Sequence, residues 1–157
     1  MENENAVEYN MKKGILFAFI GMMIGIVIWL ATIVIFRLGT YGVVDGILAA
    51  ILGILVASGY QKGLGKPTII GLILVALMTA LATIVMHLLS ATFLIYHGGM
   101  EASMCEALAT LLRSLSRDNR CPTCPTIFFR ELAIGIAIST VTVVVSLVGK
   151  KRDKLMD

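Results

Sequence analysis

The chain has 157 residues, of which 58% are hydrophobic and only 15% charged, whereas about 25% of residues are charged in a typical soluble domain. This length predicts one small domain over residues 1–157, because a membrane core and a separate soluble module would need more chain. The net charge of +3 does not indicate nucleic-acid binding, since the basic residues stand at the ends of apolar runs and form no patch.

The first apolar run covers about residues 14–36 and contains no charged residue. A helix needs about 20 apolar residues to cross the hydrocarbon core of a bilayer, so this run predicts a membrane span. It does not resemble a cleaved signal peptide, because the run exceeds the roughly 7–15 apolar residues of such a segment and no small-x-small cleavage site follows.

Three further runs predict spans at about residues 43–60, 68–96 and 127–148. At about 1.5 Å per residue the 68–96 helix is longer than a hydrocarbon core of about 30 Å, so we expect it to tilt or to project from the membrane. The last run is rich in Val, Ser and Thr, but lipid favours a helix because backbone polar groups must bond within their own segment. The predicted fold is all-α, an integral membrane four-helix bundle.

The basic residues set the predicted orientation. With the N-terminus inside the cell, every lysine falls on the inner side together with Arg152: Lys12, Lys13, Lys62, Lys66, Lys150, Lys151 and Lys154. The outer side receives Arg37, Arg113, Arg117, Arg120 and Arg130 over a longer stretch of chain. The sequence therefore predicts a multi-pass protein of the cell membrane with both termini cytoplasmic and residues 97–126 outside.

Two short connections join the first three spans. Residues 37–42 make a minimal outer loop, so the first two spans should form a tight antiparallel hairpin. The inner connection contains GLGKPT, which differs from a phosphate-binding loop because Tyr60 stands where that pattern needs glycine and Pro67 follows Lys66 in place of Ser or Thr. We therefore expect no nucleotide binding.

The outer segment, about residues 97–126, contains a predicted amphipathic helix. Its apolar residues recur at helical spacing: Met104, Leu108, Leu111, Leu112 and Leu115. Such a helix lies on the outer membrane surface or caps the bundle. Contact with lipid and packing against its own protein both remain open.

Small residues recur along the first two spans: Gly21 and Gly25, then Gly42, Gly46, Ala50 and Gly53. In lipid, small residues allow the close backbone approach that packs helices together. The stripe indicates either a homo-oligomer interface or packing of these spans within one chain, and the tight hairpin favours the latter. Tyr41, Tyr60 and Tyr96 stand at the predicted membrane interfaces, as is typical of an aromatic belt.

Ionisable residues within spans are costly and are candidates for function. Four of them map to the outer third of their spans, with Arg37 and His97 nearby: Asp45, His87, Arg130 and Glu131. They are candidates for a polar cluster that binds an ion, a proton or a lipid headgroup, but the alternative of paired, partly solvated residues at the membrane interface is favoured. His87 lies deepest in its span, with Thr83 and Ser90 at helical spacing to supply hydrogen bonds, and a structural histidine is favoured over a proton relay.

All three cysteines, Cys105, Cys121 and Cys124, lie in the outer segment, on the oxidising side. CPTC precedes a predicted helix N-terminus, which favours thiolate, so the pair is a candidate redox site. This arrangement resembles the vitamin K epoxide reductase and bacterial disulfide-generating families, but the second cysteine pair that the resemblance implies is missing from residues 37–42. A fixed disulfide between Cys121 and Cys124, or from Cys105 to one of them, is favoured. A zinc site that adds His97 is a weaker alternative.

Several motifs resemble a widespread group of small, glycine-rich bacterial membrane proteins. They are G-x3-G-x3-W at residues 21–29, LGTYG, GYQKG, and FFRELAIG at residues 128–135. The resemblance covers about residues 14–150 and implies a four-span architecture with an outer amphipathic helix. It implies no activity.

The sequence favours a non-enzymatic membrane protein with a binding or transport role, acting as a homo-oligomer or with a membrane-protein partner. One alternative is a thiol-disulfide oxidoreductase using Cys121 and Cys124 at the outer face. Another is an accessory subunit of a larger membrane complex, with the outer helix as its contact surface. No residue pattern indicates a cofactor.

Overall fold

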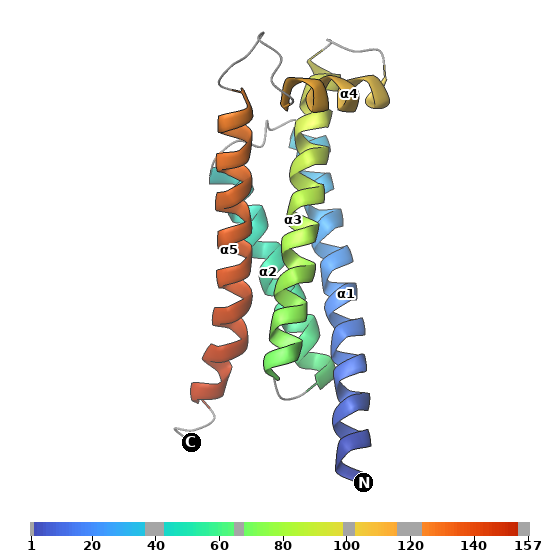
Figure 1. Cartoon of the computed structure of the whole chain (residues 1–157), viewed down its shortest axis with the longest axis vertical. Helices are drawn as coiled ribbons and strands as arrows, with labels where there is room; N and C mark the ends of the chain where they lie inside the picture. Colours follow the sequence, from blue (N-terminus) through green and yellow to red (C-terminus); the bar gives the residue numbers. More distant parts are fainter. Residues whose placement is uncertain (1, 37–42, 65–67, 99–102, 116–123, 154–157) are drawn as a thin grey trace.

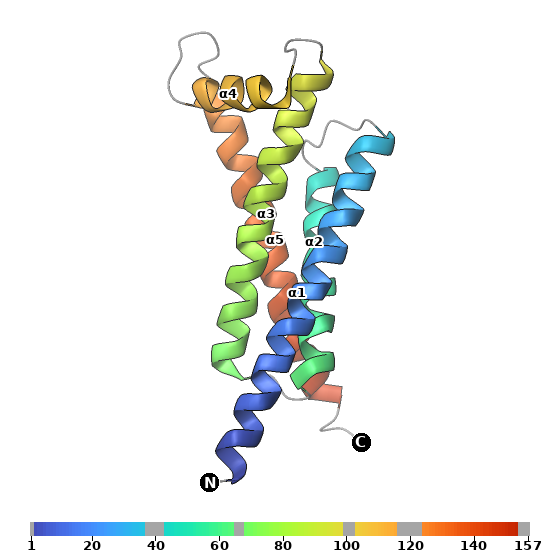
Figure 2. The ribbon, with the colours of Figure 1, turned by 90° about the vertical axis from the view of Figure 1, so that its right-hand side faces the viewer.

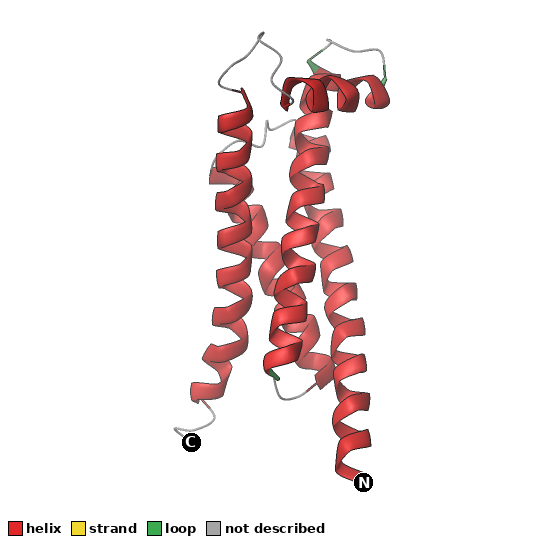
Figure 3. Ribbon diagram, in the orientation of Figure 1, coloured by secondary structure: helices red, strands yellow, loops and turns green. Residues whose placement is uncertain are grey.

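A computed structural model describes residues 2–36, 43–64, 68–98, 103–115 and 124–153. The described residues form five helices joined by short connections, so the predicted all-α fold is confirmed (Figure 3). In chain order they are α1 (Glu2–Phe36), α2 (Val43–Leu64), α3 (Ile69–His97), α4 (Met104–Leu115) and α5 (Cys124–Asp153).

Four long helices run side by side and the short α4 lies across one end of them (Figures 1 and 2). Helix α1 packs on α2, α2 on α5, α5 on α3, and α3 on α1, which closes a ring of neighbours. Helix α1 begins and helix α5 ends at the opposite end from α4, as an even number of crossings requires (Figure 1). We call these the terminal end and the α4 end.

The four long helices are apolar and long enough to cross a membrane, over Met11–Ile35, Val44–Gly63, Ile69–His97 and Pro125–Val148. Large apolar side chains such as Val27, Leu77 and Val145 are about 60% exposed on their outer faces, which suits contact with lipid and not with water. The protein is therefore a multi-pass membrane bundle. Helices α1 and α5 extend beyond the predicted spans at the terminal end, because an apolar run predicts the embedded part of a helix and not its full length.

Glycines set the closest helix contacts, and they do so within one chain. A Cβ on Gly21 would overlap the Leu55 carbonyl oxygen, and one on Gly25 would lie 2.6 Å from Leu52 Cδ1, so both pack α1 against α2. Two glycines of α2 pack against α5 instead. A Cβ on Gly53 would lie 2.7 Å from the Ser139 carbonyl oxygen, and one on Gly46 would lie 3.2 Å from Ile138 Cδ1, both on α5. The stripe thus packs α1, α2 and α5 together.

The aromatic belt predicted from the tyrosines is wrong for Tyr60. Its side chain is fully buried, and its hydroxyl lies 3.4 Å from the Thr68 hydroxyl. Tyr60 is buried because it packs in the core against α3, where Gly71 leaves room for its phenol ring. Tyr96 is partly exposed near the α4 end of α3, and Tyr41 lies outside the described residues.

Helix α4 packs on its own bundle along one edge only. Ala107 and Leu111 are buried, and Leu111 joins Ala91 of α3 and Phe128 of α5 in a small apolar cluster. A second apolar edge of the helix remains exposed, formed by Met104, Leu108 and Leu112. Helix α4 therefore covers the ends of α3 and α5. Its second apolar edge faces away from the bundle.

Candidate functional site: a buried aspartate–histidine pair

The structure brings two of the candidate polar residues together inside the bundle. Asp45 lies in the first turn of α2 and His87 lies on α3. His87 Nδ1 is 3.2 Å from Asp45 Oδ2, and the two residues are 4% and 3% exposed. An acid and an imidazole thus meet within ion-pair distance in the interior of the bundle.

The pair is incompletely satisfied by the residues around it. The 3.2 Å separation allows an ion pair, but the geometry does not align a hydrogen bond to Asp45. Within the described part of the chain, Asp45 Oδ1, Asp45 Oδ2 and His87 Nε2 are buried without a hydrogen-bond partner. Buried polar atoms of this kind are uncommon, because each costs the free energy of removing it from water. They are therefore positions where a proton or a small polar ligand would be stabilised.

An aromatic ring separates the pair from the α4 end. The Phe128 ring of α5 lies 4.8 Å from the His87 ring, centroid to centroid, at an interplanar angle of 53°. Phe128 is itself 6% exposed and packs in the cluster with Leu111 of α4. Movement of Phe128 or of α4 would therefore change access to His87.

Thr83 and Ser90 do not hydrogen-bond His87, contrary to the prediction. Thr83 Oγ1 donates to the Thr79 carbonyl oxygen and lies 3.2 Å from Ser139 Oγ on α5. Ser90 Oγ accepts a hydrogen bond from Trp29 Nε1 at 3.2 Å and donates to the Met86 carbonyl oxygen. Both hydroxyls therefore join α3 to its neighbours one turn on either side of His87, and their carbonyl bonds are the usual solution for hydroxyls in lipid-embedded helices.

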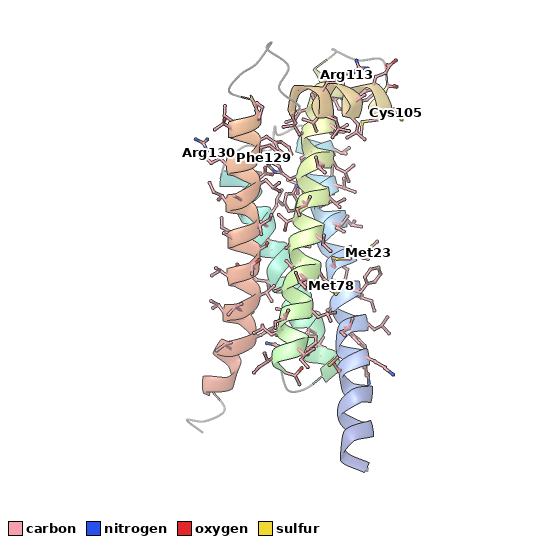
Figure 4. All side chains as sticks on the ribbon, viewed as in Figure 1. Met23, Met78, Cys105, Arg113, Phe129 and Arg130 are labelled. Atoms are coloured by element: carbon pink, nitrogen blue, oxygen red, sulfur yellow. The ribbon has the colours of Figure 1, made fainter. Side chains whose placement is uncertain are left out.

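The other two candidate residues form a second, separate pair. Arg130 Nη2 donates to Glu131 Oε1 at 2.8 Å, and their side chains are 64% and 11% exposed. Figure 4 shows Arg130 extending from α5 away from the bundle. The predicted cluster of four is thus two pairs near the α4 end, one buried and one at the surface. Of the nearby residues, Arg37 lies outside the described part of the chain, and His97 contacts Phe93 and Tyr96 at the exposed end of α3.

The cysteines are only partly described. Cys105 is exposed and carries a free thiol, so the alternative in which it pairs with Cys121 or Cys124 is not present in this structure. Cys121 and the side chain of Cys124 lie outside the described residues. Within the described ranges, no three His, Cys, Asp or Glu side chains gather closely enough to hold a metal ion.

Two parts of the site were not predicted from the sequence. Phe128 is one of several apolar residues at the start of α5, and only the packing of α5 on α3 brings its ring to His87. Trp29 stands in an apolar run like a lipid-facing residue, yet it is 1% exposed and bonded to Ser90. The G-x3-G-x3-W spacing held the signal for Trp29, because it places the indole on the same face as Gly21 and Gly25.

Comparison of the chain with family models, with curated proteins and with solved structures found no match.

Proposed function

We propose that this membrane protein acts by binding or transport, and that its working centre is the Asp45–His87 pair, which takes up and releases a proton. The observation that supports this proposal is the meeting of two ionisable side chains, each almost fully buried, with three polar atoms left without partners among the described residues. A buried pair stabilises a fold little compared with apolar residues of the same size. Its presence in a span therefore indicates a role beyond packing.

The chemistry of the pair couples proton binding to the access of water or a cation to Asp45. With one proton between the carboxyl and the imidazole, the pair has no net charge, whichever group holds the proton. Loss or gain of a proton leaves a net charge in a medium of low dielectric constant, where that charge is costly. Water that reaches the pair lowers the cost of either charge and allows proton exchange, whereas a cation that reaches Asp45 favours the deprotonated pair and would release the proton.

The surroundings of the pair suit a gated site. Phe128 and Leu111 cover it on the α4 side. Toward the terminal end the bundle interior holds apolar side chains, among them Leu52, Val56 and Val75, together with the buried hydroxyls of Thr79, Thr83 and Ser139. Passage of a proton from one side of the pair to the other would therefore depend on a change in this packing, as controlled transport requires.

The orientation and the assembly belong to the same proposal. The lysines at the terminal end favour a cytoplasmic location for both termini, so α4 would lie at the outer face of the cell membrane with Met104, Leu108 and Leu112 toward lipid headgroups. Because side chains fill the single bundle, we expect a transporting form to be a homo-oligomer.

Proton binding is tested by nuclear magnetic resonance of protein labelled with ¹⁵N at histidine and reconstituted into vesicles. The chain has two histidines, and the variant His87→Gln assigns their signals. We expect the ¹⁵N shifts of His87 to report a change of protonation with pH, and we expect Asp45→Asn to alter that pH dependence, since an amide binds no proton in this range. Glu131→Gln, the same chemical change in the surface pair, is the control and should leave the His87 signal unchanged.

A His87 signal with a single protonation state at every pH at which the protein is folded, in both the parent and Asp45→Asn, would overturn the proposal. Proton flux into vesicles under an imposed electrical potential then separates the two roles. Flux that Asp45→Asn abolishes identifies transport, whereas proton binding without flux identifies a binding role.

A further inference from the structure

A groove opens on the outside of the bundle between α2 and α5. Its floor is formed by Gly46 and Ala50, one helical turn apart on α2. Its walls are apolar and its end carries the surface ion pair: Ile47, Ile134 and Ile138, with Arg130 and Glu131. A Cβ on Gly46 would lie 3.2 Å from Ile138 Cδ1, so a side chain at this position would narrow the groove.

In a bilayer this groove faces acyl chains. It lies between two helices that each span the membrane, and Ile47 and Ile134 are about half exposed. An apolar hollow left empty loses the dispersion contacts that its walls would otherwise make. The groove therefore favours an apolar, flexible and narrow occupant.

The positive charge of Arg130 at the end of the groove favours an apolar occupant that also carries a negative group. Glu131 is largely buried and holds one edge of the Arg130 guanidinium, while Arg130 is mostly exposed. A guanidinium has five N–H donors, and the bond to Glu131 uses a donor on Nη2, so the group presented to the membrane is positive. Arg130 lies five residues after Pro125, where the span begins, or about 7.5 Å along the helix. An arginine side chain reaches from that depth to the phosphate layer.

We propose that the α2–α5 groove is a binding site for a membrane phospholipid, with one acyl chain along Gly46 and Ala50 and the phosphate on the Arg130 guanidinium. Arginine recognises phosphate through paired N–H donors, which gives this contact both strength and direction. A second copy of the chain fits less well, because a two-fold contact across the groove would bring the two copies' Arg130 side chains close together within the membrane. Neither Asp45 nor His87 lines this groove.

Native mass spectrometry of the detergent-purified full chain tests the site, with dioleoyl phosphatidylglycerol as the probe and dioleoylglycerol, which lacks the phosphate, as its match. We expect one phosphatidylglycerol to be retained by the parent protein at concentrations at which dioleoylglycerol is not. Ala50→Leu fills the groove and should abolish retention. Arg130→Gln should weaken binding about tenfold or more, the effect of losing a charge-assisted hydrogen bond.

Two matched variants serve as controls. Ala137→Leu adds the same volume to an exposed position of α5 that does not line the groove, and Lys62→Gln removes a positive charge that is exposed on α2 and likewise does not line the groove. Both should retain the lipid. Because Arg130→Gln changes a mostly exposed side chain and keeps an N–H donor beside Glu131, it keeps the test decisive even if Ala50→Leu lowers stability.

Equal retention by the parent, Ala50→Leu and Arg130→Gln would show non-specific lipid and overturn the site. Equal binding of dioleoylglycerol and phosphatidylglycerol would refute the phosphate contact. A lipid-free dimer that Ala50→Leu converts to a monomer would assign the groove to a second copy of the chain and would also overturn the proposal.

Discussion

Replacing Asp45 and His87 together should affect stability far less than replacing either one, because the two side chains are buried against each other. At 3.2 Å and an effective dielectric constant near 20, opposite unit charges attract by about 5 kcal/mol. Most of this attraction offsets the cost of removing both groups from water and lipid headgroups. The net contribution of the pair to folding is therefore small, although its two members are strongly coupled.

Asp45→Leu leaves His87 buried without its acid, and we expect it to destabilise the bundle by about 1–3 kcal/mol if the imidazole stays neutral and about 3–5 kcal/mol if it carries a charge. The double variant Asp45→Leu with His87→Phe removes both polar groups and retains an aromatic ring beside Phe128. We expect its stability to equal that of the parent or to exceed it by about 1–4 kcal/mol.

The assay is a double-mutant cycle of the parent, Asp45→Leu, His87→Phe and the double variant, measured as the free energy of unfolding in mixed detergent micelles. The circular dichroism of each variant before unfolding checks that the helices are intact. Additive single effects, with a coupling below about 0.5 kcal/mol, would refute the argument, because residues in contact within a buried pair must couple. The same double variant should lose the proton binding proposed above although its fold is retained.

Two further predictions concern the orientation and the packing. Single cysteines placed at Glu4 or Asp157, in a chain without its native cysteines, should resist a membrane-impermeant thiol reagent in intact cells, and labelling of either would reverse the proposed orientation. Gly21→Leu should lower the thermal stability of the detergent-solubilised protein, because its side chain would overlap the Leu55 carbonyl oxygen. Ala31→Leu, a half-buried position on the same helix, should cost less, and equal losses would mean that Gly21 is not a close contact.

The sequence by itself determined the class of protein and the helices that make it. An uncharged apolar run long enough to cross a bilayer has one satisfactory structure, because only a helix bonds its backbone polar groups within one segment. Helix α4 was also predicted from the sequence, because its apolar residues recur at a helical period. The predicted extent agrees with Met104–Leu115. The position of Asp45, His87, Arg130 and Glu131 toward the α4 end of their helices also followed from counting residues along each helix.

Only the tertiary structure decided which side each of these residues faces. Depth along a helix follows from sequence position, but rotation about the axis is set by the neighbours that the helix contacts, and an apolar helix in lipid has little amphipathic pattern to predict it. Packing turned Asp45 and His87 inward to meet at 3.2 Å and left Arg130 outward beside Glu131. It also gave Thr83 and Ser90 partners on α5 and α1 and buried Tyr60, because each of these positions depends on where a second helix lies.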